Sequence, residues 1–152
     1  MANESQINHE SIEVSRVSEL LLKLFSEHHD QILFGLCIKG AIYELSIPTA
    51  PKVSICNDWI IVNLPHGFGH FHICPEKITK AELISGPCSA NSDVPSMCGF
   101  RFWNQEGHQM MNIFAAELCP SGPFVSESSF IFWSKLRIEF SIEYQTNLGD
   151  LE

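Results

Sequence analysis

The sequence is poor in basic side chains: nine Lys and Arg stand against eighteen Asp and Glu, which gives a formal net charge of −9 at pH 7. Nucleic acids and anionic membrane surfaces are bound through clustered cationic side chains that neutralise phosphate groups. Because the cations are so few, we expect neither nucleic acid nor a membrane surface as a partner.

Long apolar runs are also missing. No stretch approaches the roughly 20 apolar residues of a membrane-spanning helix. The polar residues 1–8 lack the basic region and apolar run of a signal peptide. The six cysteines form no CxxC pair, and in a chain with no secretion signal such cysteines are reduced and mostly pack in the core. The sequence therefore predicts a cytoplasmic protein that starts with a flexible segment, residues 1–8.

What the chain does contain is enough apolar material for one folded domain. It has 152 residues, 45% of them hydrophobic and 18% charged, which is typical of a globular protein. This length suits a single domain over residues 1–152 with its own core and is short for two.

An amphipathic helix is predicted over residues 11–28, with Asn8 or Ser11 as its cap. Its apolar positions recur at spacings of three and four. These positions are Val14, Val17, Leu20, Leu21, Leu24 and Phe25.

Strand patterns follow over residues 32–38 and 41–47, joined by Lys39-Gly40, and then over 54–63 and 79–85. Residues 98–103 and 108–115 flank a four-residue turn that ends in Gly107, which predicts a hairpin. Residues 135–144 alternate and favour a strand, whereas 126–133 suit a short C-terminal helix. The pattern predicts an α+β fold, in which an N-terminal helix packs on an antiparallel sheet or barrel.

Three histidines and a cysteine lie within residues 65–74. In a strand, side chains alternate between the two faces, so His70, His72 and Cys74 should share one face, while Phe71 and Ile73 point into apolar packing. Imidazoles beside aromatic side chains suit an iron centre or a haem. A half-buried strand whose polar face is rich in histidine fits the same pattern.

Two blocks of sequence resemble the ChuX/HutX-type haem-utilisation family, whose members are similar to one half of the larger HemS-like proteins. The first block is residues 59–64 (Trp-Ile-Ile-Val-Asn-Leu), followed by His72 and by residues 81–84 (Ala-Glu-Leu-Ile). The second block, residues 102–114, is similar to the family hairpin Phe-x-Asn-x-x-Gly-x-x-Met-x-x-(Val/Ile)-Phe. Together with the hairpin at 32–47, the resemblance covers roughly residues 30–117.

This resemblance implies an antiparallel split barrel, usually a homodimer, that binds haem inside the cell and exchanges it with a donor or acceptor protein. It implies His72 as the axial iron ligand. His70, which is this chain's own addition, and Tyr43, whose phenolate can also bind iron, are alternative ligands. Met110, Phe71 and Phe102 are the other expected haem contacts. Whether the haem is carried or degraded stays open.

The chain departs from the family pattern at its basic positions. Asn112 stands where a basic residue is usual, Ala116 and Glu117 replace an Arg-Asp pair, and residues 87–95 form a polar insertion. We therefore expect weaker pairing with the haem propionates, and these changes leave open whether haem binding is retained.

A second interpretation is a cupin-like mononuclear metal-binding protein or dioxygenase. His70, His72 and Glu76 have the ligand spacing of a cupin site, and His108 would be the fourth ligand. Two glycines typical of that motif are replaced by Leu64 and Leu83. Pro75 would also interrupt the strand directly before Glu76.

Overall fold

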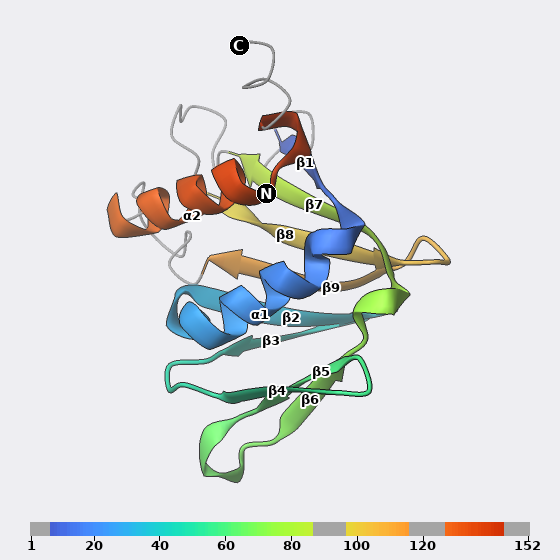
Figure 1. Ribbon diagram of the computed structural model, residues 1–152, viewed down its shortest axis with the longest axis vertical. Coiled ribbons are helices and arrows are strands. Elements are labelled where there is room, and N and C mark those ends of the chain that lie inside the picture. The colour runs from blue at the N-terminus through green and yellow to red at the C-terminus, as the bar shows by residue number, and fades with distance from the viewer. Residues whose placement is uncertain (1–6, 87–96, 116–126, 145–152) are drawn as a thin grey trace.

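The structure is a computed structural model in which residues 7–86, 97–115 and 127–144 are described. These residues form two antiparallel sheets and two α-helices, which confirms the predicted α+β class (Figure 1). The large sheet has the strand order β1-β7-β8-β9-β2-β3, and the small sheet has the order β4-β5-β6. The elements are β1 (Asn8–Ile12), α1 (Val17–Glu27), β2 (Ile32–Ile38), β3 (Ala41–Ser46), β4 (Lys52–Cys56), β5 (Trp59–Asn63), β6 (His70–Ile73), β7 (Ile78–Gly86), β8 (Met97–Asn104), β9 (Gln109–Ala115) and α2 (Glu127–Phe140).

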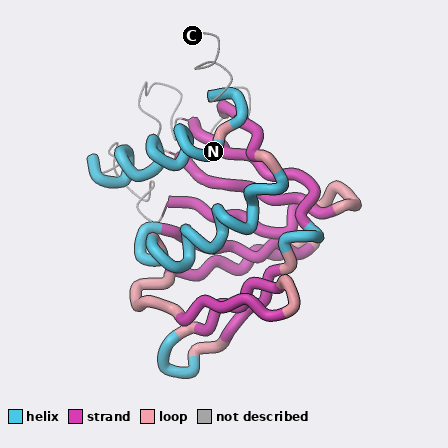
Figure 2. Tube along the Cα trace, in the orientation of Figure 1, coloured by secondary structure: helices cyan, strands magenta, loops and turns pink. Residues whose placement is uncertain are grey.

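The core lies between the large sheet and the helices, and α1 runs across one face of that sheet (Figures 1 and 2). Helix α1 also contacts β4 and β5 of the small sheet, so it joins the two sheets. Its apolar stripe is removed from water, which is the main favourable term in folding. The fully buried residues of the stripe are Val17, Leu20, Leu21, Leu24 and Phe25.

The N-terminal helix is shorter than the 11–28 predicted. Residues Asn8–Ile12 form β1 and pair with β7, so Asn8 and Ser11 lie in a strand and do not cap the helix. Helix α1 begins at Val17 after a short 3₁₀ turn, and Arg16 precedes it without a side-chain cap. Pairing of β1 with the edge of the large sheet outweighs the helical pattern in this segment.

The hairpins predicted from their turns are present: β2 pairs with β3 and β8 pairs with β9. The single strand predicted over 54–63 is wrong, because two strands, β4 and β5, meet there at a tight turn. Asn57 and Asp58 at this turn have φ angles of 49° and 67°. Two-residue hairpins of this kind favour Asn and Asp, since both residues must adopt the left-handed conformation.

The C-terminal segment is a helix, so the strand favoured over 135–144 is wrong. Helix α2 extends to Phe140. Ser141 then forms an isolated bridge with Ile12, and residues 142–144 are again helical. The helix packs beside α1 and over β8: the Phe132 ring lies 4.5 Å from the His28 ring, and the Trp133 ring lies 5.4 Å from the Phe100 ring. Tertiary packing of the apolar positions stabilises this helix.

No helix within the described ranges is long and apolar enough to span a membrane. Four cysteines (Cys37, Cys56, Cys74 and Cys98) are free thiols, whereas Cys88 and Cys119 lie outside the described residues. The substituted positions 116 and 117 and the insertion 87–95 also lie outside them.

Candidate functional site

The histidine-rich segment forms β6, the edge strand of the small sheet. Its register with β5 sets His72 opposite Ile61 and His70 opposite Asn63. Both histidines are exposed, whereas Ile73 is buried, as the alternation predicts. The two imidazole rings lie side by side with their centroids 5.1 Å apart and their planes at 40°.

The opposite face of β6 is part of the hydrophobic core. The Phe71 ring stacks on Phe34 at 4.5 Å and meets Phe25 edge-on at 5.4 Å. Phe71 therefore joins the two sheets and faces away from the histidines. Cys74 does not extend the histidine face: β6 ends at Ile73, and Cys74 is a buried residue that leads into a 3₁₀ turn over Pro75–Lys77.

The histidines share their face of the small sheet with apolar and cationic side chains. Cross-strand partners in an antiparallel sheet point to the same side, so Ile61 and Asn63 lie on this face beside His72 and His70. The next strand adds the exposed Lys52, which is the partner of Asn63. Trp59 is 42% exposed, and its ring lies 6.5 Å from the His72 ring. We call this surface the histidine face: Lys52, Trp59, Ile61, Asn63, His70 and His72.

An apolar pocket lies at the end of the same β5–β6 hairpin, where the chain turns through Pro65–Gly67. Its volume is about 250 Å³. That is below the roughly 300–1,000 Å³ of pockets that enclose a drug-sized ligand, so it has room for a small apolar group or one edge of a larger molecule. Its lining comes from the end of β3, from the β3–β4 connection and from the hairpin turn: Leu45, Ser46, Ile47, Pro48, Thr49, Leu64, Pro65, His66 and Phe68.

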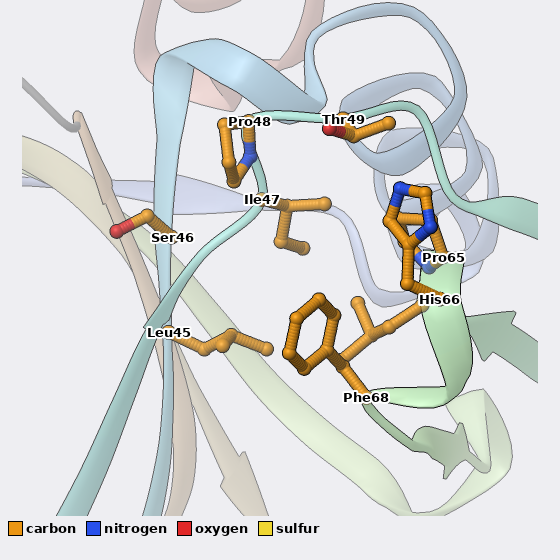
Figure 3. A pocket seen from close by; sticks show the side chains of 9 residues that line it. Leu45, Ser46, Ile47, Pro48, Thr49, Pro65, His66 and Phe68 are labelled. Carbon is orange, nitrogen blue, oxygen red and sulfur yellow. The ribbon is translucent and has the colours of Figure 1, made fainter.

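Figure 3 shows the Phe68 ring turned toward Leu45 and Ile47. His66 has a φ of 59°, a conformation that is uncommon outside glycine, and Phe68 is 78% exposed. Sequence reasoning passed over His66 and Phe68 as site residues, although the surrounding Pro65, Gly67 and Gly69 indicate a turn that exposes its side chains.

The other expected haem contacts lie on the large sheet, apart from the histidine face. Phe102 is fully buried in the core. Met110 is half-buried at the β8–β9 end of the sheet, and Tyr43 is 62% exposed on the edge strand β3. Asn112 is buried on β9, where its amide nitrogen lies 3.6 Å from Cys37 Sγ.

The four residues of the cupin-like site are not brought together, so this interpretation is corrected. His108 lies in the β8–β9 turn of the large sheet, where its Nδ1 is 3.6 Å from a carboxylate oxygen of Glu106. Glu76 lies in the 3₁₀ turn after β6. Within residues 7–86, 97–115 and 127–144, no three or more His, Cys, Asp or Glu residues are grouped so that they could hold a metal ion.

The thiols of the large sheet do not offer a reactive group either. Burial raises the pKa of the Cys98 thiol to about 12, so it stays protonated. Burial also raises the pKa of the Cys37 thiol, which lies within 3.7 Å of the Gln109 amide nitrogen. Both thiols are therefore less acidic than an ordinary cysteine and are poor nucleophiles.

Comparison with known proteins places the chain in a family and gives it a structural class. The model of the Family of unknown function (DUF7676) matches residues 2–90. No curated protein sequence matches the chain.

The fold is that of ChuX, as the sequence resemblance predicts. The crystal structure of ChuX superposes with a TM-score of 0.64 at 16% identity, covering 88% of this chain and 76% of ChuX. Holo-PhuS, a heme-binding protein from Pseudomonas aeruginosa, gives 0.67 at 16% identity, covering 92% of this chain and 36% of PhuS. ChuS, an E. coli heme oxygenase, gives 0.59 at 13% identity, covering 89% of this chain and 37% of ChuS. At these identities the likeness establishes the fold alone, and the chain spans little more than a third of PhuS and ChuS.

Proposed function

The chain belongs to the DUF7676 family, whose function is unknown, and we propose that it binds haem reversibly in the cytoplasm, as a carrier or buffer of haem iron. One observation carries the proposal. In a fold shared with the heme-binding protein PhuS, this chain exposes a histidine, His72, on a sheet face beside an aromatic ring.

The residues of the histidine face fit the chemistry of haem. A neutral imidazole nitrogen is a common axial ligand of haem iron, and His72 is free to present one. Trp59 and Ile61 offer apolar surface to the porphyrin. Lys52 is a cation for a propionate group and lies in the same cross-strand row as His70. This lysine supplies the positive charge that the family's basic positions lack in this chain.

An open face suits a carrier better than an enclosed cavity would. A carrier must release its ligand to an acceptor, so the ligand needs one exchangeable iron bond and an accessible edge. The pocket at Phe68 and His66 gives a second, smaller apolar surface at the turn of the same hairpin. His66 is therefore the alternative ligand that the structure adds to His70 and Tyr43.

A titration with hemin, followed at the Soret band, tests this function. We expect one hemin to bind per chain, and we expect His72→Ala to shift the Soret maximum and to weaken binding by about tenfold or more, because it removes the nitrogen donor. His108→Ala is the matched control, since His108 is an exposed histidine on the other sheet. If His72→Ala binds hemin like the parent while His66→Ala does not, His66 is the ligand. If the parent gives no Soret band, the proposed function is wrong.

A homodimer, as the family resemblance implies, stays a prediction. The natural place for the interface of such a homodimer is β3, an edge strand of the large sheet. Here Ile42 and Tyr43 are 63% and 62% exposed, and Ile38 of the neighbouring strand is 72% exposed. An exposed apolar edge strand presents unpaired backbone groups that a second chain can satisfy.

A further inference from the structure

The two histidines of β6 are held in an arrangement that a single haem iron cannot use. The porphyrin occupies four positions around the iron and leaves two axial positions on opposite sides of its plane. His70 and His72 project from one face of one strand, with ring centroids 5.1 Å apart. They cannot lie on opposite sides of one porphyrin, so at most one of them binds haem iron and the other has no role there.

A bare metal ion can use both side chains. We propose that His70 and His72 form a chelating site for a divalent transition-metal ion such as Cu²⁺ or Zn²⁺. In this site each imidazole supplies one nitrogen and water completes the coordination.

The ring separation matches this chemistry. An ion about 2.1 Å from one nitrogen of each ring lies roughly 3.2 Å from each ring centroid. For centroids 5.1 Å apart, the angle at the metal is then roughly 105°, close to a tetrahedral angle. Both side chains are exposed, so an ion reaches them from solvent without any opening of the fold.

The strand holds the two donors in register. His70 and His72 are two residues apart on a strand that is paired with β5 at both positions. The backbone therefore fixes both Cβ atoms on one face, and little freedom is lost when an ion binds. Binding through the first imidazole raises the effective concentration of the second, so the pair should bind much more tightly than a single exposed histidine.

The donor type sets which ions bind. Neutral imidazole suits copper, zinc and nickel, whereas magnesium and calcium prefer oxygen ligands. Copper should bind more tightly than zinc, as the general order of stability for nitrogen ligands predicts. The direct cross-strand neighbours Asn63 and Ile61 are uncharged, and the cation of this face, Lys52, lies one strand farther away, opposite Asn63.

Copper titration of the full-length protein without haem tests the proposal. Trp59 lies 6.5 Å from the His72 ring, so bound Cu²⁺ should quench its fluorescence. We expect saturation at one high-affinity ion per chain, weaker binding of Zn²⁺ in competition, and no effect of Mg²⁺. Trp59→Phe should remove most of the quenching while leaving copper affinity, measured by calorimetry, unchanged.

Single substitutions distinguish copper binding by both His70 and His72 from binding by one histidine alone or at another place on the protein. His70→Ala and His72→Ala should each lower copper affinity by about tenfold or more, because either change leaves one donor. His108→Ala should leave it unchanged, and far-UV circular dichroism should show all three variants folded. Copper affinity that survives His70→Ala, or that falls equally in His108→Ala, would overturn the proposal. The result is independent of haem: a protein that binds Cu²⁺ through both residues but gives no Soret band would retain this site and lose the proposed haem function.

Discussion

Gly35 and Asn112 lie opposite each other on β2 and β9, and their packing shows why residue 112 itself is not basic, although Arg101 on β8 is the other cross-strand partner of Asn112. Asn112 is buried, and a Cβ atom on Gly35 would overlap its side-chain oxygen. The absence of a side chain at residue 35 therefore makes room for the asparagine amide. A longer cationic side chain at residue 112 would have to fit the same space. If the proposed haem site is correct, residue 112 cannot supply a partner for a propionate group, and Lys52 on the histidine face is the cation beside the proposed iron ligand.

His28 is a second residue whose surroundings differ from those that its sequence suggests. Its position after α1 predicts a cation that interacts with the helix dipole. In the structure its ring instead packs on Phe132 of α2. The Nε2 atom of His28 lies 3.7 Å from a carboxylate oxygen of Glu27. Burial is the largest influence and lowers the pKa of His28 below its ordinary value, although Glu27 acts in the opposite direction.

This lowered pKa predicts a loss of stability in mild acid. The unfolded chain takes up a proton at His28 near pH 6.5, the ordinary value for histidine, before the folded chain does. Stability from this residue is therefore complete above that pH and falls as the pH drops toward the lower pKa of the folded state. Urea unfolding at about pH 7.5 and about pH 5.5 measures how much the free energy of unfolding changes between these conditions. We expect the parent to lose more free energy of unfolding between these pH values than His28→Gln; an equal loss in both proteins would contradict this account.

At the scale of elements, the turns were the most informative part of the sequence. Lys39-Gly40 and Gly107 predict two hairpins, and both form, because φ angles of 88° and 79° at these glycines suit few other residues. Asn57 and Asp58 also favour a tight turn, but apolar residues on both sides of them made residues 54–63 look like one continuous strand. The pairing of β1 with β7 joins residues about seventy positions apart, and no local pattern encodes such a contact.

Helix α2 shows how one pattern can fit two structures. Leu136, Ile138 and Phe140 alternate as in a strand, yet Leu136 and Phe140 are also one helical turn apart. In the structure Leu136 is 1% exposed and Ile138 is 48% exposed, which is possible only because they lie on different faces of a helix.

Alanine substitutions distinguish the two structures. Leu136→Ala should lower the free energy of unfolding by about 2–5 kcal/mol, because it leaves a cavity among buried side chains. Ile138→Ala is the matched control and should lower it by about 1 kcal/mol or less, since nearly half of this residue is in contact with water. Chemical denaturation measures both values. Comparable large losses would indicate a strand with both residues on its buried face.

For the whole molecule, the fold was more predictable than the site. Sequence blocks with a fixed turn, methionine and aromatic spacing resemble the ChuX type, and the structure superposes on ChuX at only 16% identity. The site depends on which side chains face solvent in the small sheet and on what meets at the hairpin turn. Alternation along β6 predicts the exposure of His70 and His72, but not Lys52 beside them or the pocket at His66 and Phe68, because these come from separate segments.

The central claim is that an exposed histidine holds haem so that it can be released. Acid titration of the haem-loaded protein, with Soret absorbance and far-UV circular dichroism followed together, tests it most directly. Protonation of an imidazole competes with its bond to iron, so haem should leave between roughly pH 6 and pH 4. The account predicts that the Soret band is lost while most of the far-UV signal remains. A Soret band that persists until the secondary structure collapses, or that never forms at about pH 8, would contradict it.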